Sequence, residues 1–143
     1  MPSEFLAIDH IGVAVKDLDD AVRTYRDRLG FVVEGGEALP ERGIEVRFAD
    51  TGENRIELIG ATRSDSEVSS FLDKRGEGLH HICLRVRDLD ETLADMKRRG
   101  ARLIDDTPKR GAHDRRVAFV HPKGACGVLL ELVEVPETTG GPG

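Results

Sequence analysis

The stretch that decides the fold reads IDHIGVAVKDLDDAV over residues 8–22, and its pattern returns as LHHICLRVRDLDETL over residues 79–93. A second matching stretch follows later in each half, RIELIG at 55–60 and LLELVE at 129–134. Self-similarity at a fixed spacing indicates an internal repeat, because each copy folds as one supersecondary unit. The chain therefore predicts two copies of the same unit.

Each copy begins with period-two alternation, which predicts a strand over 8–15 and another over 79–86. In the first strand one face is apolar and the other carries a histidine between small residues: Ile11, Val13 and Val15 against His10, Gly12 and Ala14. We expect the apolar face to pack on a helix and the small residues to leave space above the histidine. Cys83 and Arg85 are expected on the same face as His81.

Helix signals follow both strands. Asp17 and Asp88 are placed as N-caps, and Gly30 and Gly100 end the two apolar-periodic segments. The remaining predicted strands lie near 31–33, 44–49, 55–59, 101–103, 116–120 and 128–133, with a short helix opening at 64–66 and ending near 74.

This order gives βαβββ twice, an α+β fold in which two tandem modules form a curved mixed sheet around a metal-binding cavity. We expect a single domain over 7–134, with module one at 7–60, a linker at 61–78 and module two at 79–134. Residues 135–143, rich in Thr, Gly and Pro, predict a flexible tail.

The repeat places side chains that can bind a metal at equivalent positions. His10 and His81 match each other, as do Glu57 and Glu131, with separations of 47 and 50 residues. A lone strand histidine is usually a hydrogen-bonded core residue, but two equivalent His–Glu pairs favour a metal. An ionised carboxylate on an apolar face needs a partner, and a divalent cation is one. Such a ligand set suits Co(II), Mn(II), Ni(II), Fe(II) or Zn(II) better than Ca(II).

Other polar residues have weaker interpretations. His80 is expected on the face opposite His81, in a structural or peripheral role. Surface or hydrogen-bonding roles are expected for His113 and His121, although His113 could line the cavity mouth. Arg85 could bind a substrate anion, but a salt bridge is the simpler interpretation. Basic residues between 109 and 123 could meet phosphates or form a solvated loop.

The charge and composition of the chain limit the kinds of partner and the location that can be expected. A net charge of -6 argues against general binding to nucleic acid or to an anionic membrane surface. The amino-terminal residues do not read as a secretory signal, and no apolar segment approaches the length of a membrane span. Cys83 and Cys126 stand in apolar patterns without metal-type spacing, which predicts buried, reduced thiols in a cytoplasmic protein.

The chain resembles the vicinal-oxygen-chelate (glyoxalase and bleomycin-resistance) superfamily and, within it, the methylmalonyl-CoA epimerase family. The resemblance covers nearly all of residues 7–134. It depends on five segments: IDHIGVAVKDLD at 8–19, LPERG at 39–43, RGEGLHHI at 75–82, TPKRGAH at 107–113 and HPKGACGVLLELVE at 121–134.

The resemblance implies metal-dependent epimerisation of (2R)- and (2S)-methylmalonyl-CoA through a metal-stabilised enolate, and a role in propionate metabolism. It implies one divalent ion per chain, with Co²⁺ preferred and Mn²⁺, Ni²⁺ or Zn²⁺ possible. The implied metal ligands are His10, Glu57, His81 and Glu131, and we expect Glu57 and Glu131 also to act as the catalytic bases. The expected partners are the substrate and a second copy of the chain in a homodimer.

The chain departs from part of the family at one position. Members with Gln at the Glu57 position often carry a separate Glu on the strand after the LPERG-type turn, and the matching residue here is Val46. Its neighbour Glu45 is expected to point to the other face. That base is therefore not carried over.

Three other functions remain open from the sequence. A glyoxalase-type isomerase would use similar ligands on a hemithioacetal. An extradiol-type dioxygenase would use a His-His-Glu iron site, which a fourth ligand at Glu57 would crowd. A non-enzymatic drug- or metabolite-binding protein of the same fold commonly lacks the full ligand set.

Overall fold

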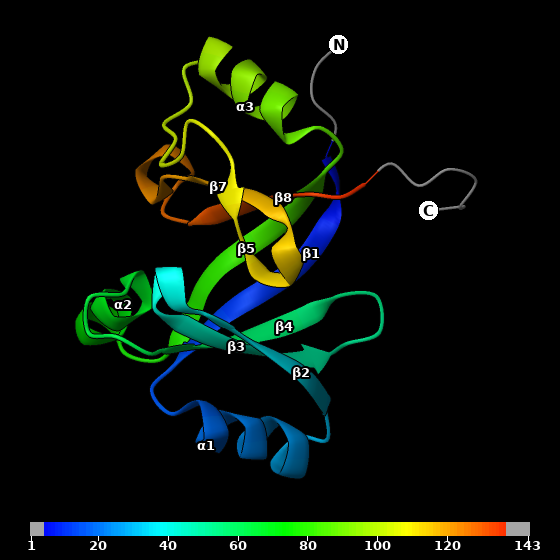
Figure 1. The fold of residues 1–143 in the computed structure, drawn as a ribbon, viewed down its shortest axis with the longest axis vertical. Coiled ribbons are helices and arrows are strands. Elements are labelled where there is room, and N and C mark those ends of the chain that lie inside the picture. The colour runs from blue at the N-terminus through cyan, green and yellow to red at the C-terminus, as the bar shows by residue number, and fades with distance from the viewer. Residues whose placement is uncertain (1–4, 137–143) are drawn as a thin grey trace. The chain divides into compact units, whose positions relative to one another are not determined.

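The computed structural model describes residues 5–136, and these form two compact units (Figure 1). One unit comprises residues 10–82, and the other residues 83–136 together with 5–9. The boundary cuts through two long strands, β1 (Phe5–Val15) and β5 (Gly78–Val86), so each unit holds half of each. The single domain predicted over 7–134 stays a prediction, and the predicted tail beyond Pro136 lies outside the described residues.

The 10–82 unit follows the predicted βαβββ order. After β1 come α1 (Leu18–Arg23), a π-helical turn (Thr24–Arg28), β2 (Val32–Leu39), a 3₁₀ turn (Pro40–Arg42), β3 (Ile44–Asp50), β4 (Arg55–Ala61) and α2 (Glu67–Arg75). The strand order is β2-β3-β4-β1. β1 runs parallel to β4, whereas β3 is antiparallel to both of its neighbours.

The 83–136 unit repeats that order. After β5 come α3 (Leu89–Arg98), β6 (Lys109–Arg110), β7 (Arg116–Val120) and β8 (Leu130–Glu134), with 3₁₀ turns at Ala112–Asp114 and Pro122–Gly124. The strand order is β5-β8-β7-β6. The strand predicted near 101–103 is wrong: only Leu103 forms a bridge, to Val120, and the short strand that pairs with β7 is β6.

The predicted helix caps are confirmed. The Asp17 side chain accepts a hydrogen bond from the Asp20 amide at 3.0 Å, and Asp88 accepts one from the Glu91 amide at 3.0 Å. Both caps satisfy an amide that the first helical turn leaves without a backbone partner. The two copies thus begin their helices by the same local chemistry.

The first turn of the helix that follows each cap makes a different contact with the sheet in the two units. In the 10–82 unit, α1 packs against β3 and β4, and a side chain at Gly60 would meet Leu18 Cβ at 3.3 Å. The position equivalent to Gly60 is Glu134, whose carboxylate accepts the Leu89 amide at 2.9 Å and pairs with Arg116. A close contact in one copy is therefore replaced by a hydrogen-bonded acceptor in the other.

The core of the 83–136 unit lies between α3 and the strands β7 and β8. Leu89 and Leu93 of α3 are both buried there. They pack with buried residues of the strands and the β5 end, namely Val86, Ala118, Val120 and Leu132.

The apolar face predicted for β1 is only partly right. Val15 is buried, but Ile11 is 36% exposed, while His10, Gly12 and Ala14 on the opposite face are buried. The histidine face of β1 is thus the better covered one. No helix among residues 5–136 is long and apolar enough to cross a membrane.

Replacing Leu93 by Ala should lower the free energy of unfolding by about 2–5 kcal/mol, because a large side chain leaves a packed core. Urea denaturation measures the change. Leu29→Ala, at a leucine that is 58% exposed, is the matched control and should change stability by no more than about 0.5 kcal/mol. Equal effects of the two substitutions would contradict the assigned core.

Candidate metal centre

Three of the four predicted ligands meet within the 10–82 unit. His10 comes from β1, Glu57 from β4 and His81 from β5, and all three side chains are buried. His10 Nε2 lies 3.1 Å from His81 Nε2. Glu57 Oε1 lies 3.5 Å from the first of these nitrogens and 3.6 Å from the second. The cluster therefore presents two nitrogens and one oxygen toward a common point.

The spacing of these atoms fits a metal ion. A point equidistant from three atoms at these separations lies about 2.0 Å from each, close to the ~2.0–2.1 Å of Zn–N bonds and the ~2.0–2.2 Å of Zn–O bonds. Two imidazole nitrogens at 3.1 Å also repel each other unless a proton or a cation lies between them. The donor set of two imidazoles and one carboxylate is one that first-row divalent metals accept.

Strand pairing explains why the three side chains converge. β1 and β4 pair in parallel, with Gly12 aligned to Glu57 at the Cα positions. His10 is two residues from Gly12, so its side chain lies on the same strand face. The register of β1 against β4 therefore sets the separation of His10 and Glu57.

Gly12 leaves room for the ring of His81, the third predicted ligand. A Cβ atom added there would come within 2.2 Å of His81 Cε1 and 2.4 Å of His81 Nδ1. The small residue predicted to leave space above His10 does leave space, and the His81 ring fills it. Glycine at position 12 of the first copy thus makes room for the histidine ring at position 81 of the second copy.

His80 has the structural role that was one of its two predicted roles, and it is not peripheral. Its Nδ1 lies 2.9 Å from His81 Nδ1, and its ring meets Phe71 edge-on at a centroid distance of 4.9 Å. Alternation along β5 predicts the opposite face for His80, but the rings of neighbouring residues can still meet side by side. The contact between the two histidine rings is therefore one that alternation alone does not predict.

The fourth predicted ligand belongs to the other unit. Glu131 lies on β8, aligned with Phe119 of β7, and is buried. Its role as a ligand and base stays a prediction.

Val46 and Glu45 lie as the sequence predicts. Val46 is fully buried on β3, and Glu45 pairs with Arg47, whose NH2 group donates to Glu45 at 3.1 Å. Both members of that pair are partly exposed. Neither residue of this segment adds a carboxylate to the buried cluster of His10, Glu57 and His81.

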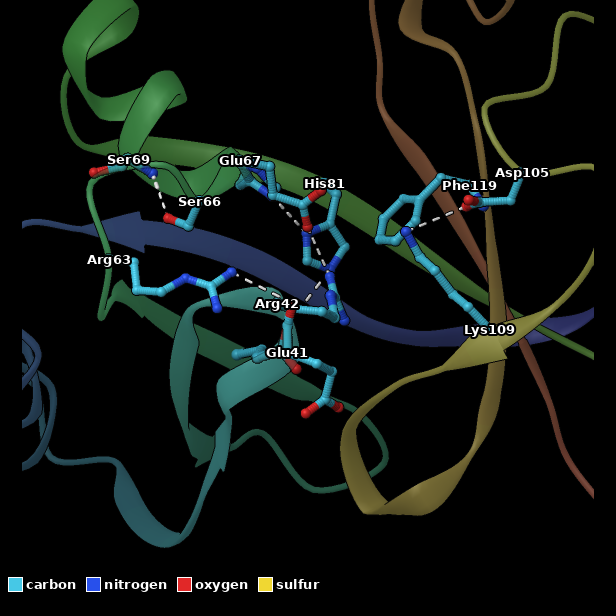
Figure 2. Close-up of polar contacts among 12 residues, drawn as sticks. Glu41, Arg42, Arg63, Ser66, Glu67, Ser69, His81, Asp105, Lys109 and Phe119 are labelled. Atoms are coloured by element: carbon cyan, nitrogen blue, oxygen red, sulfur yellow. Dashed lines mark hydrogen bonds and ion pairs between the residues drawn. The ribbon is translucent and has the colours of Figure 1, made fainter.

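An arginine that the sequence analysis did not single out holds the LPERG turn. Arg63 donates to the carbonyl oxygen of Pro40 at 2.7 Å. It also donates to that of Glu41 at 3.4 Å (Figure 2). Gly43 follows with φ +67°, and a side chain there would meet Arg63 Nε at 2.8 Å. The turn preceding β3 is therefore anchored to the chain segment that leads into α2.

Arg85 forms the predicted salt bridge. It donates to the buried carboxylate of Asp9 at 2.8 Å, and Arg115 donates to the same oxygen at 3.1 Å. Asp9 stands immediately before His10, as His80 stands before His81. The residue that precedes each predicted histidine ligand is thus buried and polar in both copies.

The basic stretch from 109 to 123 is largely paired with acids. Lys109 lies 3.5 Å from an Asp105 oxygen and 4.9 Å above the Phe119 ring (Figure 2). Arg110 pairs with Asp114, and Arg116 pairs with Asp90 and Glu134. These pairs favour the solvated-loop interpretation over a phosphate site.

Arg116 carries the clearest electrostatic effect of this stretch. The hydrogen bonds to Asp90 and then to Glu134 raise the pKa of its guanidinium above the ordinary value. The group is exposed, so the pairing contributes little to stability.

Two loop predictions have separate outcomes. His121 has the predicted hydrogen-bonding role, because its Nδ1 accepts the Lys123 amide at 3.0 Å. His113 has a φ of 60°, a left-handed conformation that a non-glycine residue adopts at a cost. Cys126 is exposed with a φ of 56°, so its predicted burial is wrong, whereas Cys83 is buried as predicted, and neither cysteine is in a disulfide bond.

The chain is similar to known proteins in sequence and in fold. Residues 9–119 match the Glyoxalase/Bleomycin resistance protein/Dioxygenase superfamily. The mitochondrial methylmalonyl-CoA epimerase of Mus musculus is 40% identical over 126 residues, which cover 87% of this chain and 71% of the mouse protein. The chain belongs to the methylmalonyl-CoA epimerase family.

Solved structures of the family agree in fold. The methylmalonyl-CoA epimerase of Mycobacterium tuberculosis superposes with a TM-score of 0.88 at 37% identity, over 96% of this chain and 93% of that one. A methylmalonyl-CoA epimerase in complex with methylmalonyl-CoA and NH4+ has a TM-score of 0.86 at 40% identity, over 92% and 95% of the two chains. The predicted α+β vicinal-oxygen-chelate fold is confirmed, as is the prediction of an enzyme in the epimerase class.

Gly12→Ala should displace the His81 ring, because the added methyl group would occupy its place. We expect a loss of about 1–3 kcal/mol in unfolding free energy and altered NMR shifts of the His81 ring. Gly36→Ala is the matched control, since its added Cβ would meet the flexible end of Arg47 at 2.8 Å. Unchanged His81 signals in Gly12→Ala would show that the ring does not lie over Gly12.

Proposed function

We propose that this chain interconverts (2R)- and (2S)-methylmalonyl-CoA with a divalent ion held by His10, Glu57, His81 and Glu131. The observation that carries the proposal is the buried convergence of His10, Glu57 and His81 in a chain of this family. A related epimerase bound to methylmalonyl-CoA supports the substrate assignment. The fourth ligand is assigned from the repeat.

The substrate defines what the site must do. The C2 proton lies between a thioester carbonyl and a carboxylate, and its removal places negative charge on the thioester oxygen. A divalent ion in the cluster would supply electrostatic stabilisation of that charge. Because the protein atoms already converge, little reorganisation would be needed to hold the ion.

Glu57 and Glu131 are proposed as the two bases. Inversion at C2 requires a proton to leave one face and to return on the other. Equivalent carboxylates from the two copies of a repeat suit that requirement. Glu57 presents Oε1 to the two imidazoles, and we assign the proton transfer to its second oxygen, Oε2.

Burial affects the base strength of Glu57. The side chain lies in a desolvated position, which disfavours the charged carboxylate, whereas a bound cation favours it. The imidazoles of His10 and His81 keep the carboxylate oriented toward the ion-binding point. Orientation and charge balance are thus the contributions that these three residues make.

The finer assignments belong to this proposal. We assign Co²⁺ as the preferred ion, with Mn²⁺, Ni²⁺ or Zn²⁺ as substitutes, because the donor set suits these metals. We also propose a homodimer and a role in propionate metabolism from the family resemblance, and a cytoplasmic location from the two cysteines without metal-type spacing.

The first test is solvent deuterium incorporation at C2 of methylmalonyl-CoA, using metal-stripped protein with and without added Co²⁺. We expect exchange and epimerisation that depend on the added ion, measured by mass spectrometry and by a chiral assay. Exchange that is equally fast without metal would overturn the metal assignment. No exchange with any divalent ion would overturn the epimerase assignment.

The same metal-loaded sample separates the alternatives. Isomerisation of a hemithioacetal would favour a glyoxalase-type enzyme, and oxygen consumption with a catechol after Fe²⁺ loading would favour a dioxygenase. Binding of methylmalonyl-CoA that survives metal removal, with no turnover after Co²⁺ is added back, would favour a metabolite-binding protein.

Glu57→Gln should reduce C2 proton exchange by at least about 10²-fold, a typical loss when a positioned base is removed. Glu45→Gln, on the outward face of the neighbouring strand, is the control and should retain the wild-type rate. The decisive comparison is exchange measured separately for each enantiomer, at saturating Co²⁺. Full exchange in Glu57→Gln would show that Glu57 is not a base.

A further inference from the structure

His80 contacts Nδ1 of His81, the ring nitrogen that faces away from the cluster of His10, Glu57 and His81. His80 Nδ1 lies 2.9 Å from His81 Nδ1, whereas His81 Nε2 faces His10 and Glu57. The two nitrogens of the His81 ring therefore have different partners. Both rings are buried, so water does not readily replace either contact.

The chemistry of imidazole links these two contacts. A neutral ring carries one proton, on either Nδ1 or Nε2. A nitrogen that binds a metal has no proton, so ligation through Nε2 requires the proton to stay on Nδ1. His80 Nδ1 lies 2.9 Å from that nitrogen and can accept the hydrogen bond.

We propose that His80 is a positioning residue that fixes the metal-binding tautomer of His81 by accepting a hydrogen bond from its Nδ1–H. His80 then carries its own proton on Nε2. The proposal depends on the metal site proposed above, and it adds a residue to which no ligand or catalytic role was assigned.

The surroundings hold the His80 ring in place. Phe71 packs edge-on against it at 4.9 Å, and Phe71 belongs to α2, which is capped by Ser66. The ring is buried on one side by this helix and bonded to His81 on the other. A held acceptor restricts rotation of the His81 ring as well as its tautomer.

Metal affinity tests the role, because partners of this kind typically contribute about 10–100-fold. Calorimetric titration of the metal-free protein with Zn²⁺ should give a Kd about 10–100-fold weaker for His80→Leu than for the wild type. His80→Asn keeps an acceptor at the position of Nδ1 and should bind Zn²⁺ within about threefold of wild type. Equal affinity of His80→Leu and wild type would overturn the proposal.

A measurement on the unaltered protein covers the case in which a variant fails to fold. Long-range ¹H–¹⁵N NMR of the Zn²⁺-loaded wild type should show His81 with a protonated Nδ1 and His80 with an unprotonated one. The opposite assignment would overturn the proposal. Failure of the wild type to bind Zn²⁺ or Co²⁺ at all would instead overturn the metal site, and this inference with it.

Discussion

The constraint on which the rest depends is the burial of one carboxylate between two imidazoles. Glu57 Oε1 and the two Nε2 atoms lie within 3.6 Å of one another, away from solvent. Such a group is stable only with positive charge among its members, supplied by a proton or by a metal ion. The parallel pairing of β1 with β4, and the bare backbone of Gly12 beneath His81, bring these atoms together.

Much of the fold and of the candidate site could be predicted from the sequence, because the repeat supplied a second observation at each important position. His10 and His81, or Asp17 and Asp88, are weak signals alone and strong ones in pairs. Periodicity and capping depend on local geometry, which a sequence expresses directly. The βαβββ order and the convergence of His10, Glu57 and His81 were predictable for that reason.

The misjudged parts depend on contacts that have no local period. Leu103 forms one bridge, to Val120, rather than a strand, and the strand that pairs with the other end of β7 is Lys109–Arg110. Cys126 stands in an apolar run but occupies a left-handed turn at the surface. His80 has a structural role, as one of its two predictions held, but alternation gave no sign of its ring contact with His81. Glu131 could be assigned from its equivalence to Glu57 and from the family resemblance.

The two copies have the same order of strands and helix, but equivalent positions carry residues of different chemistry. Gly12 is a seat for a ring, whereas the equivalent Cys83 is a buried thiol. Gly60 admits Leu18 by having no side chain, whereas Glu134 accepts the Leu89 amide and pairs with Arg116. As a result the halves are no longer interchangeable parts. A glycine at position 134 would remove the acceptor of the Leu89 amide, and a side chain at position 60 would press on Leu18, so the residues at these two equivalent positions cannot be exchanged.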